Sequence, residues 1–213
     1  MIRVFVADDH AVVRRGLKEI LDDEEDIEFC GEASDAAGLL QALQECECDI
    51  VVLDITMPGR SGLEVLKDLK AMFPAIQVLV LSMHPEDRYA IRALKAGASG
   101  YITKDGAPEE LVGAIRTITD GGKYISTPLA EELVERLKPG TEIPPHERLS
   151  DREFQVMCMI AAGKMVKEIA QELSLSVKTV STYRVHVLEK MNLKSNAEIT
   201  HYAISNRLVE FDR

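Results

Sequence analysis

The stretch that decides the fold is IVVLDITMPG, residues 50–59, in which a short apolar run ends at a single aspartate. An apolar run without polar alternation is typical of a strand that is buried on both faces. The proline and glycine that follow it indicate a turn. The stretch therefore predicts a strand over residues 50–53, with Asp54 at its carboxyl end.

The same pattern extends outward from this strand, from Met1 to about Gly121. Short apolar runs alternate with amphipathic segments, whose apolar residues recur at helical spacing. Five strand-then-helix units predict an α/β fold, a doubly wound five-stranded parallel sheet with helices on both faces. The expected strands are 2–7, 27–32, 50–53, 77–81 and 99–102, and the expected helices are 12–21, 36–46, 62–72, 86–96 and 108–119.

The remainder of the chain is helical by pattern. Residues 138–146, KPGTEIPPH, indicate an extended and mobile linker, which a short helix over 128–137 precedes. Ser150 and Glu153 have the spacing of a capping box, and Gly163 ends the helix that they begin. We expect a first domain over residues 1–121, a linker with a short helix over 122–148, and an all-α, four-helix domain over 149–213.

Composition and charge narrow the class of protein. The apolar fraction of 46% is normal for a folded chain. No apolar run reaches the roughly 18–20 residues that span a bilayer, and the N-terminus turns acidic too early for a secretion signal. We therefore expect a cytoplasmic protein. The net charge of −11 divides into −12 over residues 1–145 and +1 over 146–213, so any contact with nucleic acid is expected to be a small patch.

The four cysteines, Cys30, Cys46, Cys48 and Cys158, show no CxxC spacing and no paired histidines nearby. This spacing argues against a metal site or a structural disulfide. We expect small buried side chains or free thiols, which fits a reducing compartment.

Polar residues follow four of the five expected strands. Asp8 and Asp9 follow the first, Asp54 the third, Ser82 the fourth and Lys104 the fifth. Taken singly, such residues are typical of turns, helix caps or solvated surface. In a doubly wound sheet they meet at one edge, where three carboxylates repel one another unless a cation lies among them. A divalent ion such as Mg²⁺, together with the Lys104 ammonium, meets this need.

The chemistry that this edge indicates is acceptance of a phosphoryl group by a carboxylate. In that scheme Asp54 is the nucleophile, Mg²⁺ and Lys104 neutralise the transferring oxygens, and Ser82 donates a hydrogen bond to the new phosphoryl group. No G-x-G turn follows the first strand and no G-x-S-x-G elbow occurs, which argues against dinucleotide binding and serine ester hydrolysis. A phosphoaspartyl hydrolase would need a second aspartate where Thr56 stands.

Residues 1–121 resemble the receiver domain of two-component response regulators. The resemblance is carried by Asp8, Asp9, Asp54, Ser82, Tyr101 and Lys104. It implies a flavodoxin-like fold in which Asp54 is the phosphoacceptor, Lys104 the family's cation, and Ser82 and Tyr101 the pair that switches on activation.

The resemblance also implies a Mg²⁺ site. Its ligands would be Asp8, Asp9, Asp54 and the backbone carbonyl of Thr56. One departure from the family pattern is Asp105, which follows the lysine where the family often has proline.

The expected helix over residues 177–191 has two distinct faces. Val180, Val187, Leu188 and Met191 form an apolar stripe that belongs to a core. The other face has no large apolar side chain and suits contact with DNA. The residues expected at base edges are Lys178, Ser181, Thr182 and Val185, the last against a thymine methyl, and those expected at phosphates are Thr179, Arg184, His186 and Lys190. On this pattern alone, an ordinary helical bundle remains the alternative.

Residues 149–209 resemble the LuxR-type helix-turn-helix of NarL-like response regulators. The motifs are LSDRE at 149–153, EIA at 168–170, SVKTVSTYR at 176–184 and LKS at 193–195. The resemblance implies a recognition helix that enters the major groove of double-stranded DNA. It also implies that the last helix, over about 195–206, mediates dimers.

Together the two resemblances imply a transcription factor, not a turnover enzyme. A sensor histidine kinase is expected to phosphorylate Asp54 and thereby favour a homodimer that binds DNA. A phosphorylation-independent regulator of the same fold is the alternative. Two receiver surfaces remain possible for the dimer. One is formed by the first and fifth helices, and the other is the fourth–fifth region.

Overall fold

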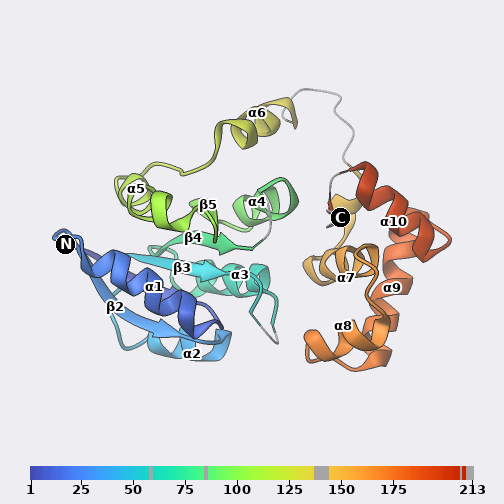
Figure 1. Ribbon diagram of the computed structural model, residues 1–213, viewed down its shortest axis with the longest axis horizontal. Helices are drawn as coiled ribbons and strands as arrows, with labels where there is room; N and C mark the ends of the chain where they lie inside the picture. Colours follow the sequence, from blue (N-terminus) through green and yellow to red (C-terminus); the bar gives the residue numbers. More distant parts are fainter. Residues whose placement is uncertain (58–59, 84–85, 137–143, 207, 210–213) are drawn as a thin grey trace. The chain divides into compact units, whose positions relative to one another are not determined.

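The structure is a computed structural model that describes residues 1–57, 60–83, 86–136, 144–206 and 208–209. The chain divides into two compact units, residues 1–133 and 134–213 (Figure 1). The first unit contains the parallel sheet and the second is helical, as the sequence predicts.

Five parallel strands form the sheet of the first unit, in the order β2-β1-β3-β4-β5. The order reverses between β1 and β3, as in doubly wound sheets, so the predicted α/β fold is confirmed. The strands are β1 (Ile2–Ala7), β2 (Ile27–Ala33), β3 (Ile50–Asp54), β4 (Gln77–Ser82) and β5 (Gly100–Thr103).

Helices cover both faces of this sheet. On one face α1 packs beside α5, whereas α3 packs beside α2 and α4 on the other (Figure 1). The helices are α1 (Ala11–Asp22), α2 (Ala36–Ala42), α3 (Gly62–Met72), α4 (Glu86–Lys95) and α5 (Ala107–Thr119), followed by α6 (Thr127–Arg136).

The core beneath α1 and α5 is built from alternate residues of the strands. Val4 and Val6 of β1 and Val52 of β3 pack there with Leu17 of α1 and Leu111 of α5. Successive side chains of a strand point to opposite faces, so the residues between them face the other helices. Both faces of the strands are therefore apolar. Burial of each large apolar side chain contributes about 1.5–3 kcal/mol to the stability of the fold.

Two boundaries in the first unit differ from the sequence-based expectation by more than one residue. α2 ends at Ala42, four residues before the predicted end at Cys46, because residues 43–46 form turns instead. Tyr124 lies beyond the expected domain end at Gly121, yet its backbone bonds to Ser99 and Tyr101 beside β5. The first unit therefore extends past Gly121.

The second unit consists of a short 3₁₀ helix and four α-helices in its described part. They are η1 (Pro145–Arg148), α7 (Asp151–Ala161), α8 (Val166–Glu172), α9 (Val177–Met191) and α10 (Asn196–Ser205). Ser150 and Glu153 form the predicted capping box of α7, and Ser176 and Ser195 cap α9 and α10. α7 packs on α8, α9 and α10, which makes it the centre of this unit.

The expected linker falls only partly within the described residues, because 137–143 lie outside them. His146, at the other end of the expected linker, is buried in the helical unit. Its Nδ1 lies 2.8 Å from the Tyr202 hydroxyl, and its ring packs near Phe154. η1 thus extends the helical unit N-terminally of the expected start at Leu149.

Candidate functional site

Polar side chains from four strand ends meet at the carboxyl edge of the sheet. Asp54 ends β3 and Ser82 ends β4, while Asp8 follows β1 and Lys104 follows β5. These four strands are neighbours in the sheet, so their ends lie at one edge. Asp8, Asp54 and Ser82 are fully buried, and only 6% of the Lys104 side chain is exposed.

Lys104 bridges two of the carboxylates. Its Nζ lies 2.6 Å from Asp54 Oδ2 and 2.7 Å from Asp8 Oδ2. Burial disfavours the charged ammonium, but the hydrogen bond to Asp54 and the ion pair with Asp8 outweigh it, so the pKa of Lys104 is raised. The Lys104 backbone N–H donates to Ser82 O at 2.8 Å, which fixes the start of this side chain beside β4. Lys104 therefore stays charged and offsets part of the negative charge.

The other oxygen of the Asp54 carboxylate is held by Thr56. Asp54 Oδ1 accepts the Thr56 backbone N–H at 2.7 Å and the Thr56 hydroxyl at 2.5 Å. The chain then passes close to itself at Gly62. Only glycine fits there, because a Cβ on Gly62 would lie 2.3 Å from the Cα of Ile55. The Thr56 hydroxyl contact was not predicted from the sequence, which singled out only the backbone carbonyl.

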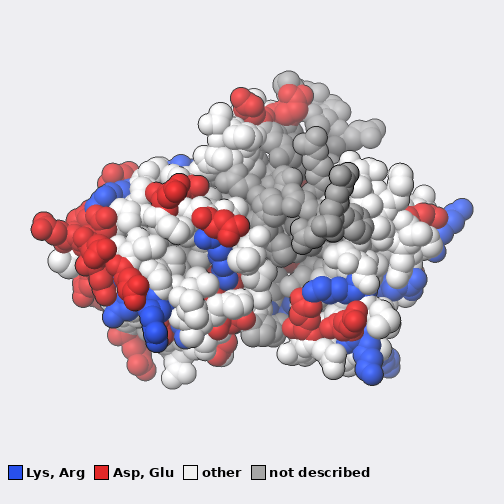
Figure 2. Space-filling view, in the orientation of Figure 1, with Lys and Arg blue, Asp and Glu red and all other residues white. Residues whose placement is uncertain are grey.

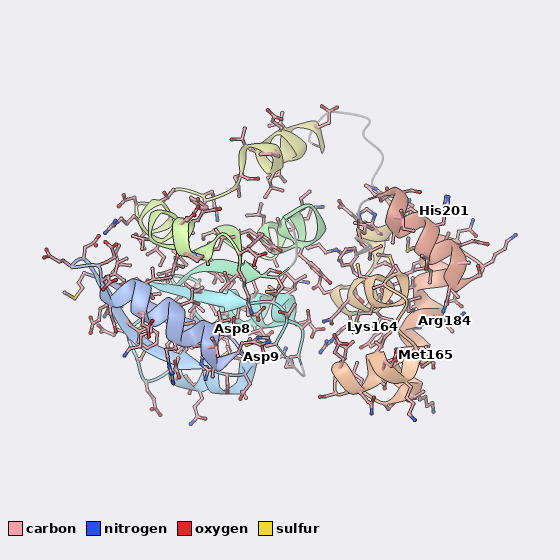
Figure 3. The ribbon with its side chains drawn as sticks, viewed as in Figure 1. Asp8, Asp9, Lys164, Met165, Arg184 and His201 are labelled. Atoms are coloured by element: carbon pink, nitrogen blue, oxygen red, sulfur yellow. The ribbon has the colours of Figure 1, made fainter. Side chains whose placement is uncertain are left out.

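Asp8, Asp9, His10 and Asp54 form a group that can hold a metal ion. Each offers one ligand atom, and these atoms all lie within 4.8 Å of one another (Figure 3 labels Asp8 and Asp9). Among the described residues, Asp8 Oδ2 and Asp9 Oδ1 are buried oxygens without a hydrogen bond, although ion-pair distances join them to Lys104 and His10. Hard carboxylate oxygens with free lone pairs suit Mg²⁺, so the residues fit the expected ion.

His10 belongs to this group, although the sequence reasoning did not select it. Its backbone N–H donates to Asp8 Oδ1 at 2.8 Å, and its Nδ1 lies 2.9 Å from Asp9 Oδ1. The ring is 60% exposed, so it lies on the solvent side of the acidic pair. Its position directly after Asp8 and Asp9 is the sequence signal that could have placed it in this group.

Ser82 and Tyr101, the expected switch pair, lie on the adjacent strands β4 and β5. Tyr101 is paired with Val80 and Ser82 with Thr103, so Ser82 and Tyr101 are diagonal neighbours on one face of the sheet. Both side chains are fully buried. Tyr101 thus lies inside the domain in this structure.

The expected recognition helix α9 presents part of the expected DNA-binding set to solvent. Lys178, Ser181, Thr182 and Val185 are exposed, and Val185 is 45% exposed although apolar. The Ser181 and Thr182 hydroxyls donate to the carbonyls of Val177 and Lys178, four residues before each of them. Each hydroxyl oxygen keeps lone pairs that can accept a further hydrogen bond.

The four residues expected at phosphates also make contacts within the unit. Lys190 Nζ lies 2.6 Å from Glu153 Oε2, and His186 Nδ1 lies 3.3 Å from Glu153 Oε1. Arg184 Nε donates to Asn196 Oδ1 at 2.6 Å (Arg184 is labelled in Figure 3), and the Thr179 hydroxyl lies 2.7 Å from that of Ser176. The exposed face formed by Lys178, Ser181, Thr182 and Val185 is therefore the sharper candidate for DNA contact.

Glu153 is almost fully buried, with 4% of its side chain exposed. Burial opposes its ionisation, but hydrogen bonds from Lys190 and Ser150 outweigh burial, so the pKa of Glu153 is lowered. The carboxylate thereby joins α9 to the start of α7.

The surface charge differs between the two units. On the face shown in Figure 2, Asp and Glu side chains gather over the first unit, whereas the second carries both signs of charge.

The two units together define a receiver followed by a helix-turn-helix, and comparison with known families agrees. Residues 4–116 match the response regulator receiver domain, and residues 147–203 match the luxR family of bacterial regulatory proteins. The chain belongs to the response regulators, in the NarL-like group that carries a LuxR-type DNA-binding domain. Such proteins are regulators rather than turnover enzymes.

Individual relatives cover nearly the whole chain. The response regulator UvrY of Escherichia coli K12 is 36% identical over 209 residues, which are 98% of this chain and 96% of UvrY. RcsB of Salmonella enterica serovar Typhimurium, bound to promoter rprA with the phosphomimetic BeF₃⁻, is 27% identical with a TM-score of 0.67, covering 96% of this chain and 100% of RcsB. RcsB in a structure of two RcsB dimers bound to two parallel DNAs is 28% identical to this chain, with a TM-score of 0.59. The match covers 96% of this chain and 98% of RcsB.

No helix in the described ranges is long and apolar enough to cross a bilayer.

Proposed function

We propose that phosphorylation of Asp54 by a sensor histidine kinase, with Mg²⁺ bound at the acidic pair, switches this response regulator between weak and strong DNA binding. The observation that carries the proposal is the buried ion pair of Lys104 with Asp54 and Asp8 at the carboxyl edge of the sheet. A buried carboxylate that faces a fixed cation is arranged to receive a group that is itself negative.

The transfer is a nucleophilic displacement at phosphorus. A carboxylate oxygen of Asp54 forms the new P–O bond while the P–N bond to the kinase histidine breaks and the imidazole leaves. Mg²⁺, when bound, neutralises charge on the phosphoryl oxygens. Lys104, whose Nζ lies 2.6 Å from Asp54 Oδ2, would neutralise the same charge, and the Thr56 backbone N–H, 2.7 Å from Asp54 Oδ1, is placed to donate to the acyl phosphate.

The switch proposed to read this group is the pair Ser82 and Tyr101. Ser82 would hydrogen-bond a phosphoryl oxygen, and Tyr101, its diagonal neighbour on β5, would keep the inward position that this structure shows. A phosphoryl group shifts the population toward this arrangement only if it binds that state more tightly, and the Ser82 hydrogen bond supplies the difference.

The output is proposed to be a homodimer on double-stranded DNA. α9 would enter the major groove with Lys178, Ser181, Thr182 and Val185 toward the bases. α10 would join two copies, because a groove lined by Leu193, Ala197, His201 and Tyr202 runs along it. The sparse positive charge of this unit predicts modest affinity for one copy, which pairing on two half-sites offsets.

Selection of genomic DNA fragments by the full chain tests this function. The wild-type protein, treated with acetyl phosphate and Mg²⁺, should enrich a palindromic site and sediment as a dimer. Asp54→Asn, treated identically, should enrich it far less and remain monomeric. Equal enrichment by both proteins would overturn the proposal in favour of a phosphorylation-independent regulator.

A further inference from the structure

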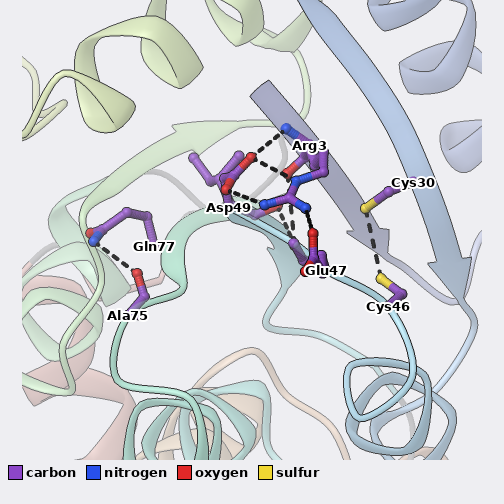
Figure 4. A network of polar contacts seen from close by, with 9 residues as sticks. Arg3, Cys30, Cys46, Glu47, Asp49, Ala75 and Gln77 are labelled. Carbon is purple, nitrogen blue, oxygen red and sulfur yellow. Dashed lines mark hydrogen bonds and ion pairs between the residues drawn. The ribbon is translucent and has the colours of Figure 1, made fainter. Parts of the chain in front are cut away.

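Three of the four cysteines gather beside the β2 edge of the sheet, away from the acidic site. Cys46 Sγ lies 3.9 Å from Cys30 Sγ (Figure 4). Cys48 Sγ lies 3.2 Å from the carbonyl oxygen of Ile50 and 3.8 Å from that of Arg3. All three are only partly buried, whereas Cys158 is buried in the helical unit. The fold thus places two sulfurs in contact that are 16 residues apart in the chain.

A β-bulge positions Cys30. Val4 pairs with Phe29 and Phe5 with Gly31, so Cys30 is the extra residue of β2. Bulges re-aim side chains and are uncommon in parallel pairs. Gly31 is required next to it, because a Cβ there would lie 2.6 Å from the Phe5 ring.

The segment after α2 is anchored where it presents Cys46. Arg3 of β1 donates to Asp49 Oδ1 at 3.0 Å and forms an ion pair with Glu47 (Figure 4). The hydrogen bond from Arg3 also holds the pKa of Asp49 below its usual range. Cys46 therefore lies next to Glu47, which forms the ion pair with Arg3, and its sulfur faces Cys30 in the bulge.

We propose that Cys30 and Cys46 are a redox-active dithiol that hydroperoxides convert to an intramolecular disulfide. The sulfurs are already in van der Waals contact and must approach to about 2.05 Å. Turns rather than helix precede Cys46, so this motion does not require α2 to unwind. Burial raises the pKa of the Cys46 thiol to about 11, and the neighbouring Cys48 thiol together with burial raises the pKa of Cys30. Both thiols are therefore protonated at neutral pH, and the pair reacts slowly.

The reaction balances in two steps. The Cys46 sulfur attacks the O–O bond of the peroxide, giving a sulfenic acid and, after transfer of the thiol proton, one water or alcohol. The Cys30 sulfur then displaces the sulfenic hydroxyl as water and forms the S–S bond. The peroxide is reduced by two electrons and the two thiols are oxidised by two. The bridge closes the loop over residues 30–46, which precedes the strand that ends in Asp54, and its formation does not depend on phosphorylation.

Oxidation of the full chain with hydrogen peroxide, followed by alkylation and intact mass, tests the proposal. The expected product has lost two hydrogens, takes up two fewer alkyl groups than the reduced protein, and recovers both with dithiothreitol. Cleavage after Glu28, Glu32, Glu45 and Glu47 separates the three cysteines, whereas trypsin leaves them on one peptide. The glutamate-specific digest should contain a fragment that links Cys30 to Cys46.

Matched variants complete the test. Cys46→Ser should lose the bridge, while Cys48→Ser and Cys158→Ser should retain it, with circular dichroism confirming that each is folded. A Cys30–Cys48 link in the wild-type protein would overturn the assignment. So would oxygen adducts without a link, a link only between chains, or an undiminished bridge in Cys46→Ser.

Discussion

The ammonium of Lys104 lies 2.6 Å from a carboxylate oxygen of Asp54, and both side chains are shielded from solvent. The same ammonium lies 2.7 Å from Asp8, so one buried cation serves two buried anions. Removing the ammonium leaves the two carboxylates buried without a cation. This lowers the free energy of unfolding by more than the loss of an exposed ion pair does.

Lys104→Met is therefore expected to lower the free energy of unfolding by about 3 kcal/mol in metal-free buffer. Excess Mg²⁺ should restore part of this loss, because a second cation would then offset the same carboxylates. Urea unfolding with and without Mg²⁺ measures both effects. Arg15→Met, which removes an exposed cation of α1, is the control and should change stability little. A Lys104→Met protein as stable as the control variant would contradict the account.

Asp8→Asn is expected to weaken Mg²⁺ binding by at least about ten-fold, because a charged oxygen ligand is replaced by a neutral amide. The affinity can be followed by calorimetry or by tyrosine fluorescence, since the chain has no tryptophan. Glu19→Gln, an exposed acid of α1 outside the cluster, should leave the affinity unchanged. Equal weakening by both variants would show that general charge, not the acidic pair, holds the ion.

Glu153 is expected to make the stability of the chain sensitive to acid. Its pKa is lowered in the folded state, so its contribution is present above the ordinary value of 4.5 and is lost as pH falls through the lowered value. Glu153→Gln should cost about 1–3 kcal/mol at pH 7 and progressively less below pH 4.5. Urea titrations of both proteins at several pH values give this difference. A penalty that stays constant down to pH 3 would exclude the carboxylate as its source.

Lys178→Ala is expected to weaken DNA binding by about 1–2 kcal/mol without loss of stability, because Lys178 is exposed at the start of α9. Lys190→Ala should instead destabilise the helical unit, since Lys190 holds buried Glu153. Fluorescence anisotropy with a selected DNA site, combined with unfolding curves, separates the two behaviours. If Lys190→Ala weakened binding at unchanged stability while Lys178→Ala did not, the assigned face would be wrong.

The fold and much of the site could be predicted because their signals are local. Apolar runs that end in Asp8, Asp54, Ser82 and Lys104 identify buried parallel strands, and the sheet order then brings their ends together. Helix caps such as Ser150 are also readable within a few residues.

The remainder depends on contacts between distant segments. His146 lies beside two prolines and is therefore predicted to be linker, but its contacts with Phe154 and with Tyr202, 56 residues later, show that it belongs to the helical unit. Lys190 is a predicted phosphate contact, and nothing near it in the sequence indicates that it also donates a hydrogen bond to Glu153 of another helix. Cys30 lies in a β-bulge and Cys46 in an anchored segment after α2, and no spacing rule predicts that the two meet.

The most direct test of the central claim is intact mass of the purified chain after incubation with acetyl phosphate, with and without Mg²⁺. We expect one phosphoryl adduct that requires Mg²⁺, is absent in Asp54→Asn and is sensitive to hydroxylamine, as an acyl phosphate must be. An adduct of equal yield in Asp54→Asn, or no adduct on folded wild-type protein, would contradict the assignment of Asp54 as phosphoacceptor.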